Sequence, residues 1–424
     1  MSIFNRPSFP KISGLRGDCG SENRCFGMHL LSAVAGGIAM GIAINHEYIA
    51  VNGLGASTWQ ITVLTMLWPV SNLLSVFINH WLAGNGRYDR ALLFVGVFAR
   101  LPLGLMFFSR SVNLLLLLLL LFFGSNSVVL PAQNSIIKNR YSDRRRMRLY
   151  GWWVSVFTLF SLPVAMVTGA LLDVEFDYYR YLFLAEAVFG AVQAVILSLM
   201  ARGMETGAVR ENGRKGPKAF FVSLYHIFRK DRDFAWFEIY FFLYGIAFLM
   251  VLPVIPFYAT ERLGLDYKQY AVSRGVIGQL GVLLLSPLLG TRLEKLHPFR
   301  FTGFVCMILV FYPIALAIGD RIPSAGVPLF YVAFAIYAIG MAGIKVSWDI
   351  SSMHFAPPGQ EATYQGLHVT LTAVRAAFAP ILGSLILYFG GYTQTFLVSS
   401  AAFAVAGFLF LRRYYGRRAQ GAFR

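Results

Sequence analysis

Apolar runs of about twenty residues recur along almost the whole chain, and they restrict its fold more than any other feature. A helix rises about 1.5 Å per residue, so roughly 20 residues cross a hydrocarbon core of about 30 Å. Only helices and closed barrels satisfy the backbone in lipid, and these runs are too long and too uniformly apolar for barrel strands. The sequence therefore predicts an all-α membrane protein. We expect twelve transmembrane helices, over residues 27–46, 58–82, 91–108, 112–136, 148–172, 180–201, 234–258, 268–289, 299–318, 327–352, 363–388 and 394–413.

The distribution of basic residues orients these helices. The formal net charge of +17 would indicate nucleic-acid binding only if the basic residues lined one face of a soluble fold. Instead, 28 of the 37 lysines and arginines lie in or beside the two termini and alternate loops, against five in the other loops. By the positive-inside rule, both termini are cytoplasmic. The expected location is a bacterial cytoplasmic (inner) membrane.

A long polar stretch divides the helices into six plus six. We expect it to form a basic cytoplasmic linker, which contains either an interfacial helix or a solvated linker helix. The predicted units are a cytoplasmic N-terminal tail, an N-terminal six-helix half, the linker, a C-terminal six-helix half and a basic cytoplasmic tail. Their limits are residues 1–26, 27–201, 202–233, 234–413 and 414–424.

The two halves carry matching features at corresponding places. Asn134 precedes Gly151 by 17 residues in the first half, and Asp349 precedes Gly366 by the same interval in the second. Parallel repeats of six helices place such features at equivalent positions. The sequence therefore predicts two pseudo-symmetric halves.

The loop after the eighth span resembles a motif of the major facilitator superfamily, which is a glycine, three residues, an acid and a base. Gly290, Glu294 and Lys295 match it, whereas the loop after the second span departs because Gly84 lies one position too far from Asp89. The resemblance covers essentially the whole chain. It implies the twelve-helix fold of that family, and a monomer that transports by alternating access.

The resemblance also implies a role for these two loops. In the family, the acid and the base pair across neighbouring helix ends on the inner side and lock the outward-facing state. Asp89 and Arg90, with Gly290, Glu294 and Lys295, are the corresponding gating residues here. The alternative is that their charges only set the topology.

Charged side chains within the spans are the candidates for the transport path, because a charge in a bilayer costs several kcal/mol. Lys345 and Asp349 lie four residues apart and can share a helix face. They form either an internal salt bridge or a site at which Asp349 titrates or Lys345 holds an anionic substrate. Arg375 and Arg100 lie in the middle of spans, so each needs a carboxylate on another helix, backbone carbonyls or a ligand.

Two further residues are candidates for proton binding. His368 lies seven residues before Arg375, on about the same helix face, and is either a packing residue or a proton relay. Glu238 lies near the inner end of the seventh span. We expect coupling to protons through Asp349 or Glu238.

Together these features predict a secondary active transporter of a small solute. The spans hold four bases against three acids, which favours an anionic or zwitterionic organic substrate. The alternatives are a membrane-embedded transferase and a lipid flippase. The expected partners are the substrate, the lipid bilayer, and protons or another coupling ion. We expect no enzyme activity, cofactor, metal site or nucleic-acid partner, and the chain has no GxxxxGK[ST] run for direct use of ATP.

Overall fold

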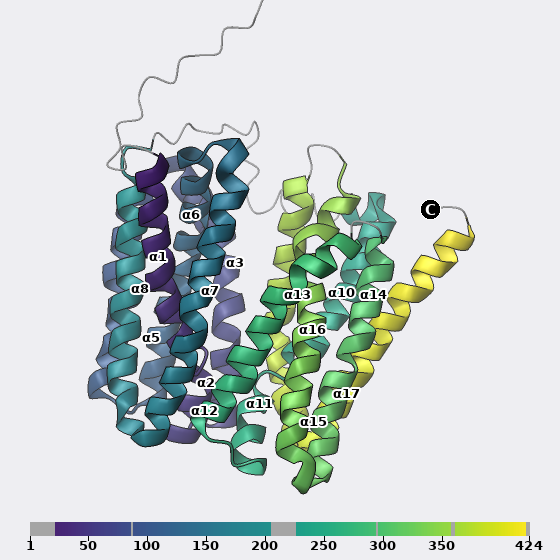
Figure 1. Cartoon of the computed structure of the whole chain (residues 1–424). Helices are drawn as coiled ribbons and strands as arrows, with labels where there is room; N and C mark the ends of the chain where they lie inside the picture. The colour runs from purple at the N-terminus through teal and green to yellow at the C-terminus, as the bar shows by residue number, and fades with distance from the viewer. Residues whose placement is uncertain (1–21, 86–87, 205–225, 294–295, 358–360, 421–424) are drawn as a thin grey trace, which may run out of the picture.

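The computed structural model describes residues 22–85, 88–204, 226–293, 296–357 and 361–420, and these residues form helices and short turns without strands (Figure 1). Nine stretches of this part of the chain are long and apolar enough to cross a membrane. One of them, Tyr364–Ala419, has 56 residues, which is enough for two crossings. The two remaining predicted spans correspond to the helix Thr58–Asn85 and to three consecutive helical segments, Tyr267–Tyr270, Ala271–Ile277 and Gly278–Leu293. The prediction of an all-α membrane protein is confirmed.

The helices extend beyond several predicted spans. The fifth span was predicted over 148–172 and the tenth over 327–352, whereas the helices run over Asp143–Val174 and Pro323–Phe355. Hydropathy detects only the part of a helix that lies in hydrocarbon, and these helices continue beyond it.

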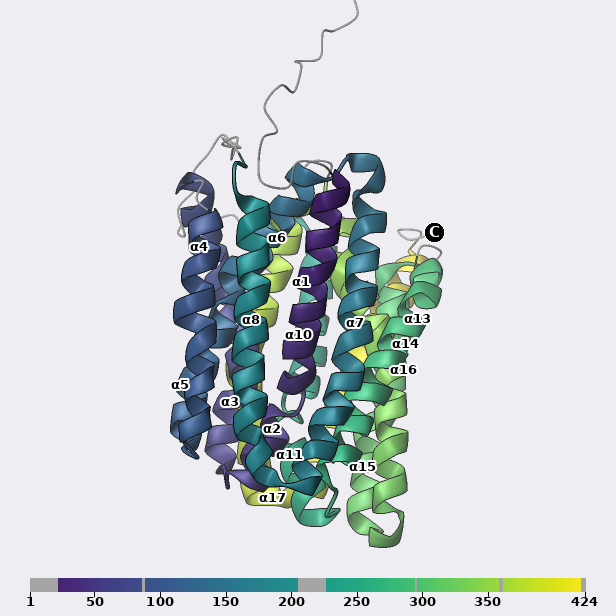
Figure 2. The same cartoon turned by 60° about the vertical axis from the view of Figure 1, so that its left-hand side comes forward.

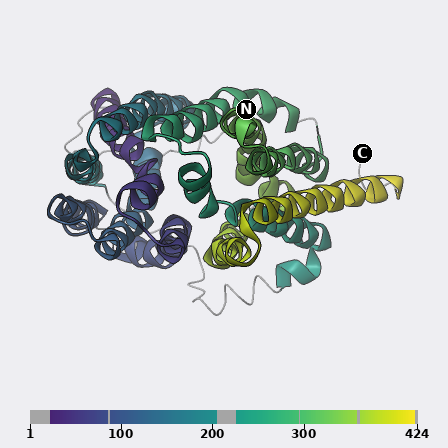
Figure 3. The ribbon, with the colours of Figure 1, turned by 90° about the horizontal axis from the view of Figure 1, so that it is seen from below.

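The chain forms two groups of helices, which Figure 3 shows side by side. The first group comprises α1 (Glu22–Ala43), α2 (His46–Tyr48), α3 (Thr58–Asn85), α4 (Tyr88–Val95), α5 (Val112–Gly124), α6 (Asn126–Arg140), α7 (Asp143–Val174) and α8 (Tyr179–Ala201). The second comprises α10 (Arg232–Leu249), α11 (Val254–Phe257), α12 (Tyr267–Tyr270), α13 (Gly278–Leu293), α14 (Pro298–Leu309), α15 (Phe311–Arg321), α16 (Pro323–Phe355) and α17 (Glu361–Ala419).

The regular α-helical geometry breaks at several places, of which the third span and α17 hold two. In the third span, a π-helical turn over Gly96–Arg100 meets a 3-10 helix over Leu101–Phe108. Pro102 has no N–H to donate, so one helical hydrogen bond is missing at this point, and Arg100 lies at the junction. Within α17, Gly391 has φ of +76°, a conformation that glycine adopts readily, and it separates the last two spans.

The two groups meet at the end of the molecule opposite the termini. The start of α1 and the end of α17 lie at one end, and α2, α11 and α12 lie at the other (Figures 1 and 2). One cluster of buried apolar residues joins both groups at that far end, where Tyr48 stacks on Tyr270. Near the termini, each group has a separate cluster, one around Leu92 and one around Phe299.

Polar contacts also join the two groups of helices. In the described part of the chain they lie at the far end, where Asp173 accepts hydrogen bonds from the backbone N–H groups of Tyr267 and Lys268, at 2.7 and 2.9 Å. Glu47 and Arg274 form an ion pair there. The structure is therefore closed at the end opposite the termini.

Candidate functional site

A buried arginine lies within the first group of helices. Arg100 is 2% exposed, and its guanidinium donates hydrogen bonds to Ser125 Oγ at 2.9 Å, the Gly190 carbonyl at 2.8 Å, Gln193 Oε1 at 2.7 Å and Asn126 Oδ1 at 2.9 Å. All four acceptors are neutral. They use four of the five N–H groups of a guanidinium, so the side chain is held in place while its positive charge is retained.

The fork geometry of Arg100 is expected to be necessary for stability. Arg100→Lys keeps the charge but cannot reach four acceptors, and each bond lost inside a membrane protein costs about 0.5–2 kcal/mol. We expect a clear fall in Tm in detergent micelles. Arg110→Lys is the matched control, because Arg110 and its partner Asp177 are largely exposed, and its Tm should match the wild type. Equal Tm values for the two variants would contradict the structural role of Arg100.

Two adjoining cavities lie next to this arginine. One of about 120 Å³ is lined by Arg100, Asn126 and Gln193 on a polar side and by aromatic residues that include Trp68. The second, of about 180 Å³, shares Trp68 with the first. It is also lined by the following residues: His46, Glu47, Thr65 and Arg274. The combined space therefore has an aromatic wall, neutral hydrogen-bonding groups and charged groups of both signs.

Sequence reasoning did not predict that a buried histidine and a buried glutamate lie together beside this space. His46 Nε2 lies 2.6 Å from a carboxylate oxygen of Glu186, and both side chains are almost fully buried. Glu186 is also close enough to Arg100 for the two charges to attract. An acid within the sixth span was the available signal, but its partner lies 140 positions away in the sequence.

The second group of helices holds a comparable set of charged residues. Glu238 on α10 accepts from His368 Nδ1 on α17, with distances of 2.8 and 3.0 Å to its two oxygens. Glu238 is 3% exposed and His368 is fully buried. Sequence reasoning proposed each residue as a candidate separately, and the structure brings them together.

Arg375 lies beside this pair. It is 5% exposed, donates to the Phe241 carbonyl, and lies 5.0 and 5.5 Å from the ring centroids of Phe241 and Tyr244. Of the partners expected for it, the structure shows a backbone carbonyl, and it adds two aromatic faces that were not expected. Gly245 makes room for the guanidinium, because a Cβ atom there would lie 2.0 Å from Arg375 Nε.

The other predicted site residues remain untested. Lys345 is exposed on α16, and the side chain of Asp349 lies outside the described residues, so their predicted pairing stays a prediction. Asp89 and Arg90 begin α4, where the Asp89 carbonyl accepts from Ser198 Oγ at 2.7 Å. The three remaining predicted gating residues come from the motif after the eighth predicted span. Gly290 lies within α13, and Glu294 and Lys295 lie outside the described residues.

One histidine outside the spans is a poor candidate for proton binding near neutral pH. Burial, with a smaller effect from neighbouring His354, lowers the pKa of His297 to about 4. Its imidazole is therefore neutral at pH 7.

The arrangement agrees with the comparison with known proteins. A family model described as Major Facilitator Superfamily matches residues 25–374, which is more than four fifths of the chain. The chain belongs to the Major Facilitator Superfamily. It is a multi-pass integral membrane protein, and its function is membrane transport.

Relatives of known structure share the superfamily fold. The peptide transporter POT in complex with sulfate has a TM-score of 0.72 and 15% identity, over 92% of this chain and 94% of that one. The nucleoside transporter NupG has a TM-score of 0.68 and 13% identity, over 91% of this chain and 98% of that one. Identities this low show the fold alone.

A relative that is similar in sequence matches over a shorter range. The proton-coupled antiporter flippase LtaA of Staphylococcus aureus (strain USA300) is 24% identical over 170 residues. The match covers 38% of this chain and 41% of the relative, so the chain matches only about two fifths of the length of that protein.

Proposed function

We propose that this superfamily member moves a small anionic or zwitterionic organic solute by alternating access, coupled to protons. One observation carries the proposal: each half encloses a buried arginine near a buried glutamate–histidine pair. The groups are Arg100 with Glu186 and His46 in the first half, and Arg375 with Glu238 and His368 in the second.

The charges within each set support an anionic group on the solute. A buried arginine that is held by neutral acceptors keeps a positive charge, which a carboxylate can approach without displacing another acid. The cavity beside Arg100 is lined by amide side chains and aromatic rings, which suit a small polar organic molecule. The charges of both signs in the adjoining cavity also suit a zwitterion.

The pair Glu238–His368 is the proposed proton site. A proton that enters a buried carboxylate–imidazole pair changes its net charge, and in a site of low dielectric this change strongly alters the electrostatic interaction of the pair with Arg375 nearby. Proton binding can thereby alter how well this half holds an anionic solute. Asp349 is a second proposed coupling residue, on the basis of the sequence alone.

The way in which the two halves meet supports alternating access. They are closed at the end opposite the termini, so the solute enters or leaves at the end of the termini. We propose that this end is cytoplasmic in a bacterial inner membrane, from the distribution of basic residues. The transporting unit would be a monomer in which residues 27–201 and 234–413 rock against each other.

The proposal is tested with purified protein in proteoliposomes that contain a pH-sensitive dye. Dipeptides, uridine, 5-aminolevulinic acid and small dicarboxylates would be added outside under an imposed pH gradient. We expect at least one carboxylate-bearing solute to cause proton movement, and a protonophore to abolish its accumulation. Accumulation that survives the protonophore would contradict proton coupling, and a response to uridine alone would contradict an anionic or zwitterionic substrate.

A lipid flippase is the second candidate function, because LtaA is similar to part of the chain. A flippase would carry a fluorescent lipid analogue from the inner to the outer leaflet, where dithionite added outside the vesicles destroys its fluorescence. We expect the protein not to speed up this loss of fluorescence. Faster lipid translocation, with no proton movement caused by the soluble solutes, would support the flippase and overturn the small-solute proposal.

A further inference from the structure

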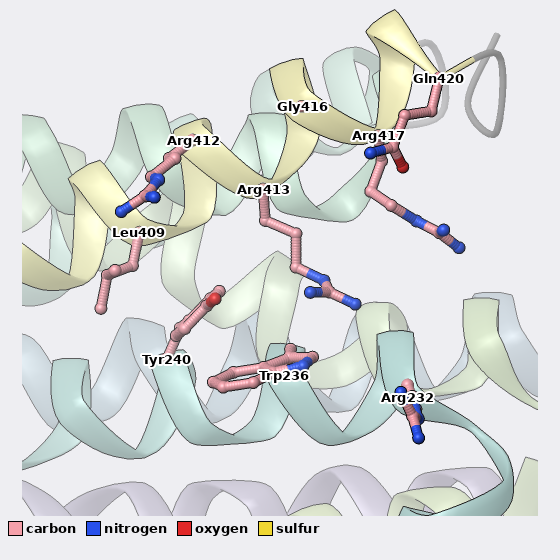
Figure 4. Close-up of a pocket in the computed structure, with 9 residues that line it drawn as sticks. All are labelled: Arg232, Trp236, Tyr240, Leu409, Arg412, Arg413, Gly416, Arg417 and Gln420. Carbon is pink, nitrogen blue, oxygen red and sulfur yellow. The ribbon is translucent and has the colours of Figure 1, made fainter.

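A basic groove lies on the outside of the second half, away from the buried charge sets around Arg100 and Arg375. It has a volume of about 530 Å³ and runs between the start of α10 and the end of α17 (Figure 4). Arg232 and Trp236 come from α10, and Arg412, Arg413 and Arg417 come from α17. Both helix ends lie on the side of the molecule where the termini lie (Figure 1).

The groove has an excess of positive charge. Asp233 holds both Arg413 and Arg417, each with an oxygen–nitrogen distance of 2.7 Å. Arg232 and Arg412 are exposed at the opening. Four guanidinium groups therefore line the groove, and one carboxylate pairs with two of them. Guanidinium groups bind phosphate oxygens in a bidentate geometry, so this arrangement suits a phosphate ester.

An apolar wall continues from the groove toward the interior of the bilayer. Trp236 and Leu409 line the groove, and the guanidinium of Arg413 lies 5.6 Å from the ring centroid of Trp236. Farther into the spans, Ile239 on α10 and Phe408 on α17 are 53% and 59% exposed. In a membrane protein these exposed side chains face acyl chains, and tryptophan is enriched at the boundary with the headgroups. A ligand with a phosphate at one end and acyl chains at the other matches both parts.

We propose that the groove between α10 and α17 binds the headgroup of an anionic phospholipid, with its acyl chains along the outer surface of the second half. Basic pockets between transmembrane helices bind such headgroups in other membrane proteins. The excess of positive charge favours anionic over zwitterionic lipids. The apolar wall favours a lipid over free phosphate, which has no acyl chains.

The test measures the Tm of the full chain in detergent micelles that contain phosphatidylglycerol, phosphatidylcholine with the same acyl chains, or inorganic phosphate. A ligand that binds the folded state raises Tm, and the stabilisation grows with the logarithm of its concentration once this exceeds its Kd. We expect phosphatidylglycerol to raise the Tm of the wild type more than the other two additives do. The double variant Arg232→Gln/Arg412→Gln should lose this difference. Arg418→Gln should keep it, because Arg418 is exposed on the same helix end but does not line the groove.

Each other outcome overturns the proposal. An equal shift with phosphatidylcholine would show that the groove does not select charge, and an equal shift with inorganic phosphate would show an ion site instead of a lipid site. Loss of the shift in Arg418→Gln would indicate attraction to diffuse surface charge. If the double variant folds poorly, two alternatives provide the same comparison. They are the single variant Arg412→Gln and the amount of phosphatidylglycerol that co-purifies with each variant.

Discussion

Replacing Glu238 by glutamine is expected to abolish proton-driven accumulation of the solute while leaving solute exchange intact. Glutamine has nearly the shape of glutamate and can still accept a hydrogen bond from His368, but it cannot bind and release a proton in the physiological range. If Glu238–His368 is the coupling site, the variant should carry solute only down its own gradient. Accumulation under a pH gradient should fall at least about tenfold, corresponding to about 1.4 kcal/mol or more of lost driving force.

Two measurements on the same proteoliposomes separate coupling from general loss of activity. Uptake under a pH gradient reports accumulation, and exchange of labelled for unlabelled solute without a gradient reports movement of the loaded protein. The matched control is Glu261→Gln, because Glu261 bonds to Tyr392 near the far end of the molecule, outside the proposed coupling site. Unchanged accumulation in Glu238→Gln would exclude this residue as the coupling group, and Asp349→Asn would then be the next variant.

Replacing Gly169 by valine is expected to separate the two halves at the end opposite the termini. Gly169 on α7 lies directly against α12 of the other half, and a Cβ atom there would lie 2.8 Å from the Tyr267 carbonyl oxygen and 2.9 Å from the Lys268 Cα. These are backbone atoms, so they cannot move aside as a flexible side chain could. Asp173, one helical turn farther along α7, also depends on this approach for its two bonds to the α12 backbone.

The expected result is a shift toward a state that is open at the end opposite the termini. Hydrogen bonds to a charged group contribute about 1.5–3 kcal/mol, so losing the contacts of Asp173 alone could change the ratio of states about tenfold. The variant Thr65→Cys, made after the native cysteines are replaced, reports this shift through its labelling rate, because Thr65 lines the cavity of about 180 Å³. We expect faster labelling of Thr65→Cys by an impermeant reagent added at the end opposite the termini.

The control for this variant lies on the same helix. Gly151→Val makes the same chemical change on α7, at a position where no heavy atom lies within 4 Å of the added Cβ atom. Its labelling rate should equal that of the wild type. Equal rates in Gly169→Val and Gly151→Val would show that contact between α7 and α12 does not control closure. Gly169→Ala and Asp173→Asn give milder changes in the same contact.

The sequence alone was sufficient to predict the all-α membrane fold, because the bilayer makes the fold class depend on how apolar the segments are. It was also sufficient for the superfamily, because the loop motif of Gly290, Glu294 and Lys295 is local in the sequence. A span must be apolar for about twenty residues, and no water is available to satisfy a backbone that is not helical. The cost of burying charge likewise identified Arg100, Arg375, Glu238 and His368 as unusual residues before their surroundings were known.

Only the tertiary structure determined which of these residues lie together and where the two halves meet. Glu238 and His368 are 130 positions apart, and the acceptors of Arg100 include two amide side chains that hydropathy does not distinguish from packing residues. Closure at one end depends on the approach of α7 to α12, and no local pattern encodes it. Burial in a membrane depends on how apolar each segment is, whereas pairing depends on how helices that are distant in sequence pack against each other.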